Sequence, residues 1–172
     1  MSCCWSFIFN FKKNYSDRMK SSKYREQKNI LIAIAIVIVD QMSKYLISRS
    51  LPYYKGYELI PNLIQIRVVR NTGAAFSLLD KQTFFLGLIS LIVSIYLCWL
   101  VINKYYTLTL KNIGISFLLG GSLGNGIDRW INGYVIDFIE LISIKFPIFN
   151  IADISINIAI LIFIIDYIRS KE

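Results

Sequence analysis

The chain has 172 residues, of which 55% are hydrophobic and only 17% are charged. Soluble domains carry roughly 25% charged residues, so this composition excludes an ordinary soluble domain and predicts a membrane protein. The net charge of +8 does not indicate a nucleic-acid partner, because the lysines and arginines gather beside hydrophobic segments instead of covering a soluble face.

The chemistry open to the chain is limited by its residue types. It contains no histidine, and its three cysteines, Cys3, Cys4 and Cys98, form no CxxC pair. These absences exclude histidine metal sites, serine–histidine and cysteine–histidine nucleophile pairs, and imidazole bases. We therefore expect no metal and no cofactor, and acid–base chemistry that depends on carboxylates.

A basic segment, residues 1–28, precedes the first hydrophobic run and carries seven lysines and arginines. Such a pair of segments is also typical of a secretory signal peptide, but "DQMSK" stands where small cleavage-site residues belong. We therefore predict an uncleaved first span and a cytoplasmic extension, residues 1–28, that contacts anionic lipid. Cys3 and Cys4 are expected to be free thiols.

Four segments are apolar enough to cross a bilayer, which takes about 20 residues. The predicted spans are residues 30–48, 84–102, 108–127 and 152–168, within a single membrane domain over 29–170. Lysines and arginines lie before the first span, between the second and third, and after the fourth, which predicts that both termini are cytoplasmic. Residues 49–83 and 128–151 then face outward, where the β-branched stretch between Pro61 and Gly73 predicts one or two short strands of a small β-rich platform.

Ionisable residues at membrane depth are costly and are usually paired or functional. Asp40 and Lys44 are four residues apart, so they share one helical face and can form an ion pair or link to a neighbouring helix. Gly120 and Gly124 predict close helix packing. Packing does not explain Asn125 and Asp128, which fall on a common face with Gly121.

Three further polar residues have both a structural and a functional interpretation. Asn150 and Asp153 have the spacing of a helix N-cap and an acidic third residue. Asn71, in "RNTGAAF", is compatible with a turn before Gly73. Arg129 can extend to the membrane interface, or it can hold a carboxylate or a lipid headgroup.

The predicted topology brings Asp128, Asp137 and Asp153 to the same outer rim. Two carboxylates held close together at a low-dielectric boundary do not both ionise readily, so one stays protonated while the other is charged. Such a pair can hydrolyse a peptide bond, since the charged member activates water and the neutral member polarises the carbonyl. Spacing alone does not choose between Asp137 and Asp128.

Five separated blocks, "DQMSK", "RNTGAAF", "GNGIDR", "VIDF" and "FNIAD", cover about residues 30–168. In these blocks the chain resembles the lipoprotein signal peptidase family, also called signal peptidase II, the membrane aspartic proteases that remove signal peptides from bacterial prolipoproteins. The resemblance implies an all-α polytopic membrane fold of four transmembrane helices, with a small β-rich extracytoplasmic platform and a short surface helix. It also implies cleavage before a diacylglyceryl-modified cysteine, at the outer face of the bacterial inner membrane.

The resemblance assigns the catalytic pair to Asp137 and Asp153. Asp128 stays the fallback candidate, and otherwise we expect it to be an orienting partner of Arg129 or Lys44. Close contacts are assigned to Gly73, Ala75 and Ala152. The chain departs from the family pattern in its basic extension and at Gly126, where a bulkier apolar residue is common and looser packing is expected. The supporting positions are Asp40, Lys44, Asn71, Gly73, Asn125, Asp128, Arg129, Asn150 and Ala152.

The expected partners are diacylglyceryl-modified prolipoproteins and membrane lipid, with no nucleic acid, and the expected state is a monomer. Two rival functions remain from the residues alone. A proton-coupled transporter also uses intramembrane carboxylates, but it predicts acids spread through the bilayer depth. A structural membrane protein would use the charges only for assembly, and replacing Asp137 or Asp153 by Asn would then abolish no hydrolysis.

Overall fold

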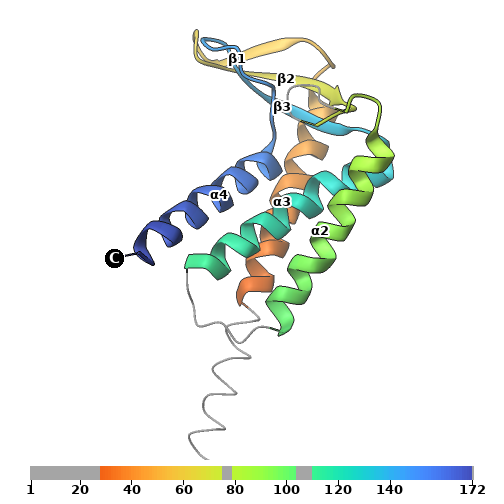
Figure 1. Cartoon of the computed structure of the whole chain (residues 1–172). Coiled ribbons are helices and arrows are strands. Elements are labelled where there is room, and N and C mark those ends of the chain that lie inside the picture. The colour runs from red at the N-terminus through yellow and green to blue at the C-terminus, as the bar shows by residue number, and fades with distance from the viewer. Residues whose placement is uncertain (1–27, 75–78, 104–109, 172) are drawn as a thin grey trace, which may run out of the picture.

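The computed structural model describes residues 28–74, 79–103 and 110–171. The described residues form four helices and one three-stranded sheet, which lies across one end of the helices (Figure 1). The predictions for Ala75, and for residues 1–27 with Cys3 and Cys4, lie outside these ranges. The helices are the N-terminal span (Lys28–Ser50), α2 (Thr83–Asn103), α3 (Leu110–Asn132) and α4 (Ile151–Arg169).

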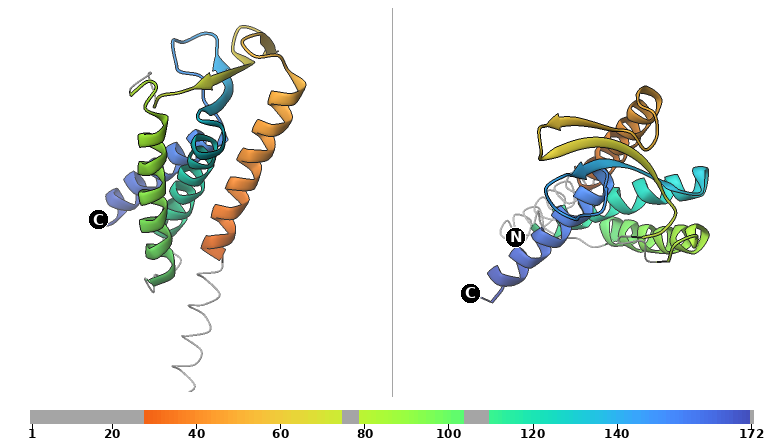
Figure 2. Two further views of the ribbon diagram at one scale, coloured as in Figure 1. Left: turned by 90° about the vertical axis from the view of Figure 1, so that its right-hand side faces the viewer. Right: turned by 90° about the horizontal axis from the view of Figure 1, so that it is seen from above.

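The four helices confirm the predicted fold class. Three of the described helices, the N-terminal span, α2 and α4, are long and apolar enough to cross a membrane. Helix α3 is less apolar because it contains five glycines and three asparagines. It packs against both α2 and α4, while α4 slants away from α2 (Figures 1 and 2). Its polar residues are thus shielded by neighbouring helices.

Glycines let α3 approach its neighbours closely, as predicted for Gly120 and Gly124. A Cβ atom on Gly120 would lie 2.8 Å from Cβ of Ile36 in the N-terminal span, and one on Gly121 would lie 2.5 Å from the carbonyl oxygen of Ala152 in α4. Real Cβ atoms do not come this close to such atoms, so the observed packing requires glycine at both positions.

Gly126 lies on another side of α3. It lines an apolar cavity of about 270 Å³ between α2 and α3, together with Ser90, Ser94, Ser122 and Trp130. A Cβ atom on Gly126 would lie 3.2 Å from Cβ of Ser90 in α2, so the two helices are close at the glycine itself. The looser packing expected at Gly126 stays a prediction, because the cavity lies beside this close contact.

The sheet is antiparallel with the strand order β1 (Gly56–Ile60), β2 (Ile64–Asn71) and β3 (Val135–Leu141). Strand β2 confirms the prediction between Pro61 and Gly73, whereas β1 and β3 were not predicted as strands. The short surface helix is not found among the described residues of the outer segments, where residues 142–145 form turns. The pairing of Val69 with Asp137 brings Asp137 beside the end of β2.

Candidate active site

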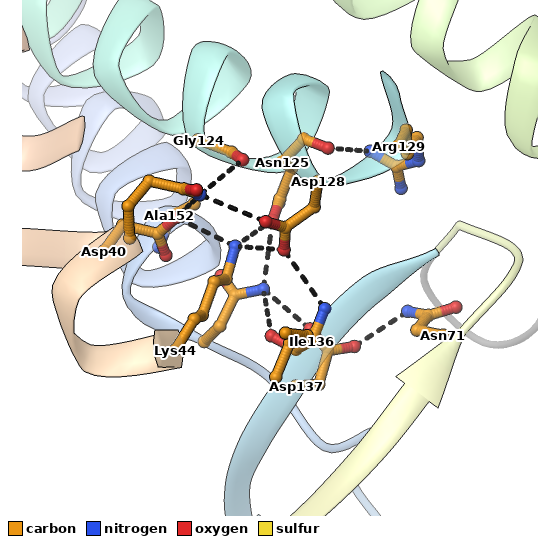
Figure 3. A network of polar contacts seen from close by, with 12 residues as sticks. Asp40, Lys44, Asn71, Gly124, Asn125, Asp128, Arg129, Ile136, Asp137 and Ala152 are labelled. Carbon is orange, nitrogen blue, oxygen red and sulfur yellow. Dashed lines mark hydrogen bonds and ion pairs between the residues drawn. The ribbon is translucent and has the colours of Figure 1, made fainter. Parts of the chain in front are cut away.

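Buried polar side chains converge where the sheet meets the N-terminal span, α3 and α4 (Figure 3). Each of the most buried members is no more than 2% exposed, and all were predicted as site residues: Asp40, Lys44, Asp128, Asp137 and Asn150. Charged and polar groups this deeply buried are stable only when they are paired and hydrogen-bonded. Their partners therefore define the site.

Lys44 is at the centre of the ionic contacts. Its Nζ lies 2.8 Å from Oδ2 of Asp40 and 3.0 Å from Oδ2 of Asp128, and it donates to Oδ1 of Asn125 at 3.1 Å. The predicted pair of Asp40 and Lys44 is thus confirmed, and it also links two helices. Of the two partners considered for Asp128, the structure shows Lys44 and not Arg129.

Asp137 lies on β3 and accepts hydrogen bonds on both oxygens. Nδ2 of Asn71 donates to its Oδ2 at 2.8 Å, and Nδ2 of Asn150 donates to its Oδ1 at 2.6 Å. Burial, together with the nearby charge of Asp153, raises the pKa of Asp137 to about 7 in spite of these two hydrogen bonds. This carboxyl group therefore gains and loses its proton near neutral pH.

Asp153 lies at the start of α4, where it forms the predicted cap with Asn150. Oδ1 of Asn150 accepts from the backbone N–H of Asp153 at 2.9 Å, and the backbone N–H of Asn150 donates to Oδ2 of Asp153 at 3.2 Å. This reciprocal capping box satisfies two amides at the helix start. The remaining Asp153 oxygen, Oδ1, accepts from Nδ2 of Asn125 at 2.7 Å. Asp153 therefore caps α4 and is also hydrogen-bonded to the polar cluster.

Asn71 and Arg129 close the site on the side of β2. Oδ1 of Asn71 accepts from the backbone N–H of Gly73 at 2.9 Å, so the predicted turn is present while its amide points to Asp137. Nη2 of Arg129 donates to the carbonyl of Gly73 at 3.1 Å, and Nη1 donates to that of Asn125 at 3.5 Å. Arg129 therefore contacts carbonyl groups, and its buried Nε has no partner among the described residues.

Asp137 and Asp153 both line one groove with a cavity volume of about 840 Å³. Polar side chains lie on one part of its wall, including Asn71, Asn125 and Arg129, and apolar ones on the other, including Phe146, Ile148 and Ile156. Asp128 lies beside Lys44 in a separate cavity of about 440 Å³. The three acids share one end of the bundle, but only Asp137 and Asp153 share a groove.

Gln41 was not predicted as a site residue. Its Nε2 donates to Oδ1 of Asp128 and to the carbonyl of Gly124, both at 3.1 Å, and to Oδ2 of Asp40 at 3.2 Å. The sequence feature that could have identified Gln41 as a site residue is its position beside Asp40 in "DQMSK". Within residues 28–74, 79–103 and 110–171, no three acidic or cysteine side chains are grouped as metal ligands.

Comparison with known proteins gives one consistent result. Residues 32–169 match the family model described as Signal peptidase (SPase) II. The lipoprotein signal peptidase of Parasynechococcus marenigrum (strain WH8102) is 44% identical over 153 residues, which cover 89% of this chain and 96% of that protein. The lipoprotein signal peptidase of Staphylococcus haemolyticus (strain JCSC1435) is 37% identical, over 87% of this chain and 98% of that protein.

The fold gives the same result. A solved structure, described as a bacterial membrane enzyme structure by the in meso method, superposes with a TM-score of 0.79 at 36% sequence identity. The match covers 85% of this chain and 90% of that one. From its sequence and its fold, the chain belongs to the signal peptidase II family, the lipoprotein signal peptidases.

Proposed function

We propose that this chain is an aspartic endopeptidase that removes the signal peptide of bacterial prolipoproteins, with Asp137 and Asp153 as its catalytic pair. The observation that carries the assignment is that both acids line one groove and that Asn150 contacts them both. Membership of the signal peptidase II family supports the substrate class. The bond that is hydrolysed precedes the diacylglyceryl-modified cysteine.

The two acids divide the chemistry. Asp153, held at the N-terminal end of α4 by an amide N–H and by Asn125, is the carboxylate that takes a proton from water. The resulting hydroxide attacks the scissile carbonyl carbon, while protonated Asp137 donates to the carbonyl oxygen. The proton on Asp153 then passes to the departing amine as the C–N bond breaks, and the hydroxyl group formed on the carbonyl oxygen returns its proton to Asp137. A pKa of about 7 supports protonated Asp137 as the acid.

The groove supports binding of an extended peptide beside the two acids. Its apolar wall suits the small and apolar residues of a signal peptide, and its polar wall offers amide and guanidinium donors to the peptide carbonyl groups. The substrate's apolar helix would lie against the exposed faces of the spans, and its acyl chains would stay in lipid. This arrangement would supply much of the orientation that the reaction needs.

We further propose that both termini are cytoplasmic and that the groove opens at the outer face of the inner membrane. The distribution of lysines and arginines supports this orientation. The sheet lies at the end of the bundle opposite the start of α3 and the end of α4, which carry Lys111 and Arg169 (Figure 1). The basic extension, residues 1–28, would then contact anionic lipid on the cytoplasmic side, and the protein would act as a monomer.

The transporter alternative has less support. It predicts charged residues through the depth of the membrane, but α2 contains no aspartate, glutamate, lysine or arginine. The buried acids of the polar cluster lie together instead, and two of them, Asp137 and Asp153, line one groove. A hydrolytic function accounts for this clustering more directly.

The deciding experiment is cleavage of a diacylglyceryl-modified prolipoprotein by the purified protein in lipid. Wild type is compared with Asp137→Asn and Asp153→Asn, and with Asp166→Asn as a matched control in the far half of α4. We expect wild type to cleave before the modified cysteine and the control to keep near wild-type activity. In Asp137→Asn and Asp153→Asn, the two variants of the catalytic pair, we expect the cleavage rate to fall by roughly 10³-fold or more. A well-folded Asp137→Asn or Asp153→Asn variant with activity within tenfold of wild type would contradict the assignment.

A further inference from the structure

Lys44 is connected to the sequence neighbours of both proposed catalytic residues. Its ammonium group has three N–H donors and three partners: Asp40, Asp128 and Asn125, at 2.8, 3.0 and 3.1 Å (Figure 3). Lys44 itself is 2% exposed. All three donors are used inside the protein, so each partner is held in a defined direction.

The first connection runs through Asp40 to α4. While Oδ2 of Asp40 contacts Lys44, its Oδ1 accepts from the backbone N–H of Ala152 at 2.9 Å. Ala152 directly precedes Asp153 and is fully buried. Asp40 thus satisfies one of the free amides at the start of α4 from a different helix, and it fixes the backbone that carries Asp153.

The second connection runs through Asp128 to β3. Oδ2 of Asp128 contacts Lys44 and also accepts from the backbone N–H of Ile136 at 3.1 Å. Ile136 directly precedes Asp137 in the chain. The same ammonium group is therefore joined, through one carboxylate on each side, to the backbone immediately before each proposed catalytic aspartate.

The third connection runs through the side chain of Asn125. Its Oδ1 accepts from Lys44 and from Nδ2 of Asn150 at 3.0 Å, which leaves Nδ2 to donate to Asp153. Turning the carboxamide over would point its N–H groups at an ammonium and at another amide donor, and its oxygen at a carboxylate. The positive charge of Lys44 therefore sets the amide orientation that Asp153 requires.

We propose that Lys44 is a positioning residue, which fixes the backbones of Asp137 and Asp153 relative to each other and orients the Asn125 amide toward Asp153. The inference rests on the proposed function. The alternative is that the buried charges only stabilise the fold. In that case a neutral replacement of the whole ion cluster would preserve both stability and catalysis, because buried ion pairs contribute little net stability.

The test compares Lys44→Met with the triple variant Lys44→Met, Asp40→Asn, Asp128→Asn. The single variant leaves two buried carboxylates without their cation, so we expect it to lose both stability and activity. The triple variant removes that uncompensated charge, while the new asparagines still offer an oxygen to the N–H groups of Ala152 and Ile136. We expect its thermal midpoint to recover toward wild type, its kcat to stay roughly 100-fold below wild type, and its KM to change less than threefold. Lys111→Met, an exposed change at the opposite end of α3, is the matched control.

Recovery of kcat together with stability in the triple variant would overturn the positioning role and leave the proposed function intact. If wild type itself cleaves no lipidated substrate, the proposed function fails and this inference fails with it. Should the triple variant not fold, Asn125→Leu tests the third connection alone. A folded Asn125→Leu enzyme with kcat within threefold of wild type would overturn the proposal, whereas a roughly 100-fold loss of kcat would support the connection through Asn125.

Discussion

The carboxamide of Asn150 donates to Oδ1 of Asp137 at 2.6 Å, one of the shortest contacts between side chains in the polar cluster. The other half of the same amide, Oδ1, accepts from the backbone N–H of Asp153 and caps α4. One fully buried side chain thus joins a strand residue to the first turn of a helix. Helix capping and the geometry of the proposed dyad depend on the same residue.

Capping and catalysis can be separated at Asn150 by two substitutions. Asn150→Ala removes the capping oxygen and the donor to Asp137, so we expect a loss of about 1–2 kcal/mol in stability and a large loss of activity. Asn150→Ser restores a capping oxygen but not a donor that reaches Asp137. We expect it to recover most of the stability and little of the cleavage rate, as measured by thermal unfolding and by kcat. Equal recovery of both would mean that the contact with Asp137 has no role in catalysis.

The sequence predicted those parts of the fold that a local pattern of residues indicates. Hydropathy indicated the helices, and the spacing of Asn150 and Asp153 indicated the capped start of α4. Strand β3 was missed because its first four residues are all buried, so it lacks the alternation that marks a half-exposed strand. The end of α3 was predicted five residues early, at 127. Asp128 and Arg129 resemble the start of a polar segment, although Asp128 pairs with Lys44 of the N-terminal span and Arg129 donates to the carbonyl of Gly73.

Most residues of the polar cluster were singled out from the sequence, but Gln41 and the connections between the residues were not. A spacing of four gave the pair of Asp40 and Lys44, since both lie on one helix. The choice between Asp128 and Asp137 depended on tertiary structure, because Asp128 faces Lys44 and only Asp137 lines the groove with Asp153. No local pattern encodes which cavity a side chain reaches. The resemblance to a known family supplied that choice in advance.

The proposed mechanism predicts the pH dependence of cleavage. Asp137 must be protonated to polarise the substrate carbonyl, and its pKa is raised to about 7. We therefore expect kcat/KM to fall as the pH rises through about 7, and also to fall at acid pH, where the water-activating carboxylate becomes protonated. The measurement is kcat/KM against pH in lipid of fixed composition. A flat profile from about pH 6 to about pH 9, a range that brackets this pKa, would argue against Asp137 as the acid.

Removing the hydrogen bond from Asn71 should shift the alkaline limb of the pH profile, which is the fall in kcat/KM as the pH rises. The bond stabilises the charged form of Asp137 and so lowers its pKa. Without it the carboxyl group holds its proton more tightly, and in Asn71→Ala the fall in kcat/KM should occur at higher pH than in wild type. Gln82→Ala, an exposed change in the outer segment before α2, should leave the limb in place. An unshifted limb in Asn71→Ala would assign the titration to a different group.

The same carboxyl group predicts a pH dependence of stability. Its pKa is 3.8 in the absence of perturbation and about 7 in the folded protein, so between these values the native state binds more protons than the unfolded state. Stability from this group is present at low pH and falls as the pH rises toward about 7. We expect the thermal midpoint of the solubilised protein to decrease over this window, and Asp137→Asn to have a shallower slope. An identical slope in the variant would contradict the assignment.

Close packing of α3 against the N-terminal span predicts a different result at two glycines. A methyl group on Gly124 would lie 2.6 Å from Oδ2 of Asp40 and 3.2 Å from Cβ of Ala152, so Gly124→Ala must displace the carboxylate that holds the start of α4. Overpacking of this kind costs about 1–3 kcal/mol, and the cleavage rate should fall with it. At Gly126 the nearest atom to a methyl group is Cβ of Ser90 at 3.2 Å, beside an open cavity. Gly126→Ala should therefore cost less stability and little activity. Equal losses at both glycines, measured by thermal unfolding and by cleavage, would mean that the contact with Asp40 is not what makes Gly124 necessary.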